Sequence, residues 1–270
     1  MHGGSGKLRQ RVAKGDTLVF GCVTDSRSGS VIEAYEEAGY DVVMIDREHT
    51  ALNHETILEH IRLCRLLNLP CMVRVAELGY AELNRTLDQL PDGVFVPRIR
   101  SRTEVERVVE TVKYPPLGKR GIGASTCPAG RYLGWRSTSE QIERLNTDTV
   151  LGIQIETAEA MDDLDGILSV PGVDMAVVGN DDLSTGLGIP GQLDSERYRE
   201  AVMRIIHTCR RHGVVPGIAA RNAETVTYWA ERGMRVFWSA TDVYLLWEAA
   251  AGQCRRVKAA IGNAREGASE

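Results

Sequence analysis

Eight short apolar runs, none of which alternates with polar residues, constrain the fold of this chain more than any other feature. Each run is four to seven residues long and rich in Val, Ile and Met. Such runs are typical of strands that are buried on both faces, as in a parallel sheet covered by helices. The runs lie at residues 17–23, 41–45, 71–75, 93–96, 150–155, 173–178, 214–218 and 234–238.

Stretches with helical periodicity separate these runs, and apolar residues recur in them at spacings of three and four. The clearest are residues 51–67, 103–112, 158–168, 195–211 and 223–232. The alternation predicts an α/β fold, a single-domain (β/α)₈ TIM barrel. A doubly wound open sheet is the competing fold, but no G-x-G-x-x-G follows the first run, which disfavours it.

The length of 270 residues suits one barrel domain, which we expect at residues 17–270 behind an N-terminal extension at residues 1–16. A long final helix is expected at about residues 241–263, where it could reach a neighbouring subunit.

The composition disfavours several classes of partner and location. The net charge of −5 gives no attraction to nucleic acid or to an anionic membrane. No window approaches 18 consecutive apolar residues, and the N-terminus lacks the apolar segment of a signal peptide. The six cysteines form no C-x-x-C pair, which favours free thiols in a reducing compartment. We therefore expect a cytoplasmic protein with no nucleic-acid or membrane partner.

Ionisable residues follow several of the apolar runs, at the barrel end where active sites gather. The run at 41–45 stops at Asp46, and His49 follows three residues later. Glu156 and Asp182 follow consecutive runs, so their carboxylates should be neighbours that a divalent cation stabilises, Mg²⁺ or Mn²⁺. Arg74 would add an anion-binding corner.

Each of these residues also has a structural interpretation. Glu156 could cap the helix that follows it, and Asp182 could be an ordinary loop acid. His49 could be a packed or capping imidazole, and Arg74 could pair with Asp46. The joint pattern at neighbouring strand ends favours a site.

The five lysines constrain the chemistry. They stand at positions 7, 14, 113, 119 and 258, and none follows an apolar run. A Schiff-base mechanism needs a desolvated lysine in the barrel mouth. Carbonyl chemistry in this barrel should therefore be assisted by a metal.

Several segments together resemble the HpcH/HpaI aldolase family, the class II pyruvate-dependent aldolases. They occur in the family's order between about residues 21 and 250 and read "EAYEEAGYDVVMIDREH", "VRV", "TLDQLPDGVFVPRIRS", "KYPPLGKRGIG", "QIET" and "GNDDLSTGLG". The resemblance implies a homo-oligomeric barrel, trimer or hexamer, whose final helix is exchanged between subunits.

The resemblance also implies roles for individual residues. It implies that Glu156 and Asp182 bind the metal, Mg²⁺, Mn²⁺ or Co²⁺. The catalytic base region maps to His49 and Asp46, and Arg74 maps to the arginine beside the keto oxygen. An aspartate that supports the histidine maps to Asp88. Substrate contacts map to these positions: Gln154, Gly179, Asn180, Asp181 and Ser184.

The chain departs from the family pattern at three places. Arg47 stands where the family has glycine, and Asn180-Asp181 stands where it has proline followed by another residue. Cys127 and Pro128 stand where small residues are common. Without the proline, φ at Asn180 is free, and Asp181 adds negative charge beside the predicted metal. These departures leave the identity of the substrate open.

The expected activity is cleavage of a 4-hydroxy-2-oxo acid into a 2-oxo acid and an aldehyde through a pyruvate enolate, or the reverse. One alternative is a related metal–enolate enzyme, an oxaloacetate-type decarboxylase or an acyl-CoA lyase. Another is a barrel without catalytic activity that binds a keto acid. The aldehyde is expected over residues 114–136.

Overall fold

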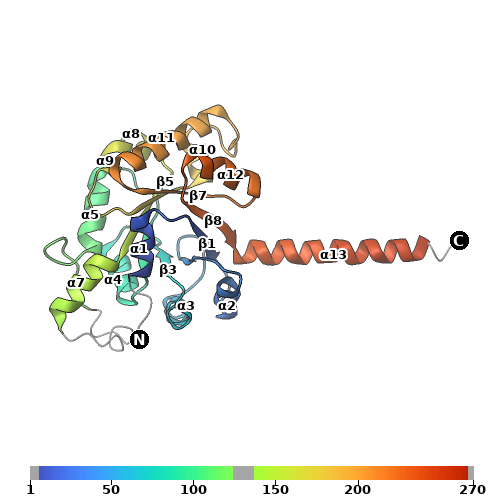
Figure 1. The fold of residues 1–270 in the computed structure, drawn as a ribbon, viewed down its shortest axis with the longest axis horizontal. Helices are drawn as coiled ribbons and strands as arrows, with labels where there is room; N and C mark the ends of the chain where they lie inside the picture. Colours follow the sequence, from blue (N-terminus) through green and yellow to red (C-terminus); the bar gives the residue numbers. More distant parts are fainter. Residues whose placement is uncertain (1–5, 124–136, 267–270) are drawn as a thin grey trace.

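The chain folds into a closed barrel of eight parallel strands surrounded by helices (Figure 1). The structure is a computed structural model, and it describes residues 6–123 and 137–266. Each strand pairs in parallel with the next, and β8 closes on β1. The predicted (β/α)₈ barrel is therefore confirmed.

The strands follow the eight apolar runs closely. They are β1 (Leu18–Val23), β2 (Val42–Asp46), β3 (Cys71–Arg74), β4 (Gly93–Val96), β5 (Val150–Ile155), β6 (Met175–Val178), β7 (Val215–Ala219) and β8 (Val236–Thr241). The helices of the first half are α1 (Lys7–Lys14), α2 (Ser30–Glu37), α3 (His54–Leu67), α4 (Tyr80–Asp88) and α5 (Arg102–Val112). Those of the second half are α7 (Thr138–Asp148), α8 (Ala158–Asp162), α9 (Leu164–Leu168), α10 (Asn180–Gly186), α11 (Glu196–His212), α12 (Ala223–Arg232) and α13 (Asp242–Glu266).

One predicted helix differs from the structure. Residues 158–168 were expected as a single helix, but α8 and α9 meet at Asp163. The carboxylate of Asp163 accepts the backbone N–H of Arg102 at 2.7 Å, so this residue is held by the start of α5. Local periodicity cannot report such a long-range contact.

Both faces of the sheet are buried, as the runs without alternation predicted. Inside the barrel, Phe20, Met44, Met72 and Phe95 are buried together. Outside, residues such as Ile153 and Val178 pack under the helices. The interior is therefore filled by side chains, and chemistry has to occur at the ends of the strands.

Helix α1 covers the end of the barrel at which the strands begin. Leu8 and Val12 are buried in the same cluster as the interior strand residues. Arg11 pairs with Asp41 at 2.6 Å, and Arg9 pairs with Asp174. Residues 7–14, which fall in the predicted N-terminal extension, thus contribute to the barrel core.

Three aspartates stabilise the end of the barrel at which the strands begin, and all three make the same type of hydrogen bond. Each directly precedes an even-numbered strand and accepts a backbone N–H from the preceding strand at 2.8 or 2.9 Å. The pairs are Asp41 with Val19, Asp92 with Cys71 and Asp174 with Leu151.

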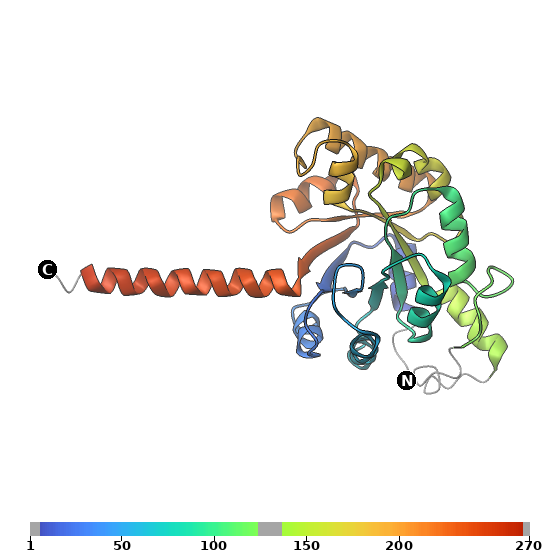
Figure 2. The same ribbon diagram turned by 180° about the vertical axis from the view of Figure 1, so that it is seen from behind.

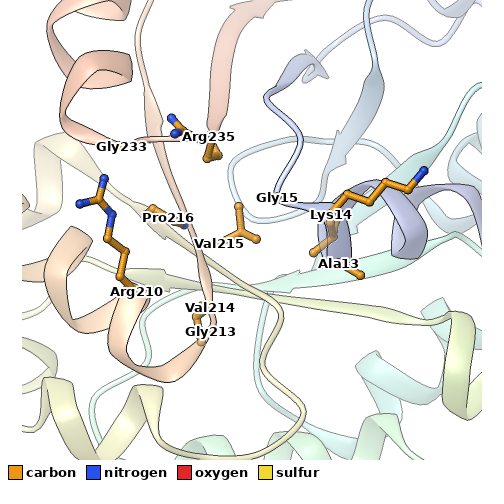
Figure 3. A pocket seen from close by; sticks show the side chains of 11 residues that line it. Ala13, Lys14, Gly15, Arg210, Gly213, Val214, Val215, Pro216, Gly233 and Arg235 are labelled. Carbon is orange, nitrogen blue, oxygen red and sulfur yellow. The ribbon is translucent and has the colours of Figure 1, made fainter.

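Before β8, the remaining even-numbered strand, the corresponding residue is an arginine and not an aspartate. Arg235 directly precedes β8, and the residue opposite it is Pro216, which has no N–H to donate. These two residues line a cavity of about 300 Å³ (Figure 3). The cavity's arginines donate to carbonyls in the last turn of α12, Arg210 to Arg232 at 3.1 Å and Arg235 to Ala230 at 3.3 Å. We therefore assign this cavity a structural role.

Helix α13 leaves the barrel at the end of β8 and projects away from it as a straight arm (Figures 1 and 2). Its exposed large apolar side chains include Val243, Leu246 and Trp247. Across residues 6–123 and 137–266, no helix combines the length and apolarity needed to cross a membrane.

Candidate active site

The centre of the site is an ion pair between two register partners of neighbouring strands, Asp46 in β2 and Arg74 in β3. Arg74 donates from Nε to one oxygen of Asp46 and from Nη2 to the other, both at 2.7 Å. Asp46 is 1% exposed. A bidentate pair of this kind fixes the plane of the guanidinium and aims its remaining donors.

The network continues from Arg74 into strand β5. Nη1 of Arg74 donates to Oε1 of Gln154 at 3.2 Å, and Nε2 of Gln154 donates to Oε2 of Glu156 at 2.9 Å. Gln154 lies in β5, Glu156 directly follows the strand, and both are buried. The predicted substrate contact Gln154 thus lies between the arginine and the predicted metal ligand.

Glu156 is a carboxylate in an environment that disfavours its charge. It is 3% exposed, and burial raises its pKa to about 7. The nearby carboxylates of Glu48 and Asp182 act in the same direction, and the N–H of Arg98 opposes them. Gly179 makes room for this carboxylate, because a Cβ there would lie 2.0 Å from Oε2 of Glu156.

Arg98 joins the two predicted metal ligands. Its backbone N–H donates to Oε1 of Glu156 at 2.7 Å, and Nη1 of its side chain donates to Oδ1 of Asp182 at 3.3 Å. One residue therefore contacts both carboxylates, and the charge of Asp182 acts on Glu156.

This pair of carboxylates fits a divalent cation. Within the described ranges, no group of three or more His, Cys, Asp or Glu side chains forms a metal cage. Mg²⁺ and similar hard cations bind to one or two carboxylates and keep several waters, so two acids suffice. A cation would also neutralise the buried charge of Glu156, which its raised pKa shows to be poorly compensated.

The predicted base His49 lies at the rim of the site. Its side chain is 65% exposed, and Nε2 lies 3.6 Å from Oε2 of Glu48. The same Oε2 of Glu48 lies 3.1 Å from Nη1 of Arg74. Burial is the largest factor that raises the pKa of Glu48. Glu48 therefore links the histidine to the central ion pair.

Asp88 lies apart from His49. It ends α4, and Oδ1 accepts from Nη2 of the buried Arg120 at 3.0 Å. A Cβ on Gly123 would lie 2.6 Å from Oδ2, so the chain passes close to this carboxylate. No hydrogen bond joins Asp88 to His49 within the part of the chain that the structure describes. Its predicted support of the histidine stays a prediction.

The predicted substrate loop surrounds the start of α10. The side chain of Asn180 donates to the carbonyl of Ala219 at 2.9 Å and accepts from Tyr198 at 2.8 Å. Ser184 is buried and donates to the carbonyl of Asp181 at 2.9 Å. The side chains of Asn180 and Ser184 thus hold the loop in shape, so contacts of these two residues with a substrate would come from their backbone. The role of this loop in binding stays a prediction.

Two further residues shape the mouth. Arg47, a departure from the family pattern, pairs with Glu82 at 2.5 Å. The ring of Trp238 lies 5.7 Å from the Arg74 guanidinium, and its indole N–H is buried with no hydrogen-bond partner among the described residues. Nothing in the run at 234–238 distinguished Trp238 from a core residue. Cys127 and Pro128 lie outside the described residues.

The lysine with the most perturbed environment lies at the wrong end of the barrel for Schiff-base chemistry. Burial lowers the pKa of Lys113 to about 8. Its ammonium donates to the carbonyls of Asn146 and Thr149, at 2.8 and 3.0 Å. Thr149 precedes β5, whereas Glu156 follows it. The structure thus supports the inference from the lysine positions.

A buried arginine, an amide and paired carboxylates at the carboxyl ends of barrel strands are typical of enzymes that stabilise a developing oxyanion. The fold and the site thus define a barrel enzyme with an electrostatic, cation-compatible centre.

Comparison with known proteins gives the family. The family model described as HpcH/HpaI aldolase/citrate lyase matches residues 20–247, and the chain belongs to this family. Similar relatives include the 4-hydroxy-2-oxo-heptane-1,7-dioate aldolase of Shigella sonnei (strain Ss046), 30% identical over 213 residues, 79% of this chain and 80% of the relative. Another is the 4-hydroxy-4-methyl-2-oxoglutarate aldolase tasA of Hapsidospora irregularis, 30% identical over 76% of each chain.

Solved structures agree with this assignment. The HpcH/HpaI aldolase from Desulfitobacterium hafniense DCB-2 superposes with a TM-score of 0.87 at 29% identity, over 93% of this chain and 96% of that one. The family and the aldehyde-lyase class predicted from the sequence are confirmed. Membership of the family also implies a divalent metal.

Proposed function

We propose that this protein cleaves 4-hydroxy-2-oxo acids into pyruvate and an aldehyde, or joins them, with a divalent cation held by Glu156 and Asp182. The names of the aldolase relatives support this substrate class. The observation that carries the proposal is the continuous network from Asp46 through Arg74 and Gln154 to Glu156. In this network the amide of Gln154 bridges the guanidinium of Arg74 and the carboxylate that we propose to bind the cation, and a keto oxygen bound there would gain negative charge.

The cation, when bound, supplies Lewis acidity to the 2-keto group of the substrate. Arg74 stabilises the charge that develops on that oxygen. A guanidinium has five N–H groups, and Asp46 takes one from Nε and one from Nη2. The two N–H groups of Nη1 face Gln154 and Glu48, so the second N–H of Nη2 is left for a substrate oxygen.

His49 acts as the base in this proposal and accepts the proton of the C4 hydroxyl, either directly or through a water. The C4 carbonyl of the aldehyde then forms as the C3–C4 bond breaks. The electron pair of that bond becomes the C2–C3 double bond, and the pair of the C2 carbonyl moves onto its oxygen to give the enolate of pyruvate. A proton returned to C3 completes the cleavage. Glu48, whose Oε2 lies 3.6 Å from Nε2 of His49, orients the imidazole.

The proposal is tested by incubating the purified protein with pyruvate and a panel of aldehydes. Each reaction is run after chelation and after addition of Mg²⁺, Mn²⁺ or Co²⁺, and the aldol product is measured by mass spectrometry. We expect product with a cation and none with the chelator. Glu156→Gln should abolish turnover, whereas Glu159→Gln, an exposed control on α8, should not. Turnover that resists chelation would contradict the proposal.

Two other functions would give different results in the same assay. Release of CO₂ from oxaloacetate without any aldol product would identify a decarboxylase. Calorimetric binding of Mg²⁺ and pyruvate without turnover would identify a binding protein.

We also propose that the protein is a homo-oligomer in which α13 packs on a neighbouring copy, and that it is cytoplasmic. The exposed apolar side chains of α13 support the first point, because large apolar patches mark interaction sites.

A further inference from the structure

Three aromatic side chains from different strands form a stack inside the barrel that ends at Arg74. Phe95 in β4 is the register partner of Arg74. Its ring makes edge contacts with two others, with centroid distances of 6.0 Å to Phe20 in β1 and 5.2 Å to Trp238 in β8. The ring centroid of Trp238 lies 5.7 Å from the guanidinium carbon of Arg74. The stack therefore joins the barrel core to the central arginine of the site.

The neighbouring strand leaves space for this stack and fixes its position. Gly152 in β5 is the register partner of Phe95, and a Cβ at this position would lie 2.1 Å from the Phe95 ring. Phe20 and Phe95 are both fully buried. Side chains in a close-packed interior have little freedom to move. The edge contact with Phe95 therefore determines where the indole of Trp238 lies.

Hydrogen bonding does not explain the presence of Trp238. A buried tryptophan usually finds an acceptor for its N–H, and an unsatisfied buried donor costs free energy. The indole nitrogen of Trp238 is buried and has no acceptor among the described residues. The contacts that do explain this side chain are those of its ring, with Phe95 and with Arg74.

The contact of Trp238 with Arg74 differs in kind from the other contacts of that arginine. The N–H groups of Arg74 point along the plane of the guanidinium, toward the polar partners described above. The indole instead attracts the positive charge through the face of its ring, an interaction that acts within about 6 Å of the ring centroid. The ring therefore opposes a movement of the guanidinium that the hydrogen bonds alone would allow.

We propose that Trp238 is a positioning residue that holds Arg74 in the orientation in which its remaining Nη2 N–H meets the substrate oxygen. This inference rests on the proposed function, because that function places the keto oxygen at Arg74. Without the indole, the guanidinium can tilt while it stays paired with Asp46. Hydrogen bonds weaken steeply when the donor is misaligned, and a small misplacement of a group that stabilises the transition state lowers the rate.

The first test compares kcat and KM in three variants, each assayed well below its Tm. Trp238→Leu removes the ring, Trp238→Phe keeps a ring without the N–H, and Trp229→Leu removes a buried tryptophan from α12 as the control. We expect kcat to fall about threefold to tenfold in Trp238→Leu, with KM for pyruvate within about twofold of the wild type. The fall should be smaller in Trp238→Phe, and the control should keep the wild-type kcat. A wild-type kcat in Trp238→Leu would overturn the proposal.

The second test asks whether Trp238 acts through Arg74. Trp238→Leu is combined with Arg74→Lys, which has no guanidinium for the ring to hold. If the ring acts through Arg74, the double variant should have the same kcat as Arg74→Lys alone. A role confined to packing would lower kcat by the same factor in both backgrounds, and that result would overturn the proposal.

The third test does not depend on turnover. Oxalate is a planar dianion that resembles the enolate of pyruvate, and its Kd is measured by calorimetry in the presence of Mg²⁺. The Kd should be about threefold to tenfold weaker in Trp238→Leu and unchanged in Trp229→Leu. If the wild type binds oxalate in this way but turns over no aldol substrate, the proposed function fails and the positioning role remains. Equal Kd values in Trp238→Leu and the wild type would overturn the positioning role, and a wild type that neither turns over nor binds oxalate would overturn both.

Discussion

Asp46 and Arg74 face each other as register partners in adjacent strands, and the guanidinium meets both carboxylate oxygens at 2.7 Å. The pair carries both structural and chemical consequences. The backbone register alone brings the two residues together, and the bidentate contact then sets the direction of every other Arg74 donor.

Substitution of this pair should separate its two roles. Asp46→Asn leaves Arg74 without its buried partner, so we expect the free energy of unfolding to fall by about 3–5 kcal/mol. Arg74→Lys keeps the charge but loses the fork, and kcat should fall about 10²- to 10³-fold. Urea unfolding and steady-state kinetics measure the two effects. Arg62→Lys, in an exposed pair, is the control, and a wild-type kcat in Arg74→Lys would contradict the assignment.

The buried carboxyl of Glu156 should make cation binding depend on pH. Its pKa is raised from 4.5 to about 7, so below pH 7 a proton competes with the cation. We expect the Kd for Mn²⁺ to be about tenfold weaker at pH 6 than at pH 8. Titration calorimetry at both pH values, with Glu159→Gln as control, measures this change. Equal Kd values would show that the carboxyl is already ionised at pH 6.

The same group should affect stability in the opposite direction to an ordinary salt-bridged acid. The cation-free folded protein binds more protons than the unfolded chain between pH 4.5 and about 7, so stability falls as the pH rises through this window. Glu156→Gln removes a cost on the order of 3 kcal/mol at pH 8 and little of it at pH 4.5. Thermal unfolding of both proteins at each pH tests this. A substitution effect that is independent of pH would exclude the raised pKa.

The contact between Glu48 and His49 predicts a change in the pH profile. His49→Gln should lower kcat about 10²- to 10⁴-fold, because the base is lost. Burial raises the pKa of Glu48, and Glu48→Gln removes this titrating carboxyl beside the base, so the acidic limb of kcat/KM should move to lower pH. The profile of Glu55→Gln, which changes an exposed acid on α3, should match the wild type. An unmoved limb in Glu48→Gln would show that Glu48 does not position the base.

The exposed face of α13 predicts an assembly defect. Leu246 and Trp247 are 73% and 62% exposed, although both are large and apolar. Aspartate at both positions should break a contact with another copy and reduce the mass measured by light scattering. Gln253→Asp, on the same helix, should leave the mass unchanged. A wild-type protein that is already monomeric would refute the proposed assembly.

The barrel and the central acids were predictable because strand patterns fix which residues end each strand. Asp46, Arg74, Gln154 and Glu156 lie in or directly after strands, and their neighbours follow from the order of strands. The links through Glu48 and Arg98 were not predictable. They depend on loop conformation, a positive φ in one case, and no periodicity reports it.

The position of Asp88 shows a different gap in sequence reasoning. A family motif identified it, yet its observed partner Arg120 comes from a loop, 32 positions along the chain. Likewise, α1 is an amphipathic helix, but its sequence does not show that its apolar side packs against the open end of the barrel. Pairings between distant segments arise from the assembled fold and leave no local signature.

Asp242 belongs to two parts of the molecule at once. It is the first residue of the projecting helix, and its carboxylate accepts the backbone N–H groups of Thr24, Asp25 and Ser26 in the loop after β1. That loop lies at the same end of the barrel as the active site. If another copy of the chain docks on α13, any shift of the helix would therefore act directly on this loop at the rim of the active site. Assembly would then influence the shape of the substrate entrance as well as join the chains.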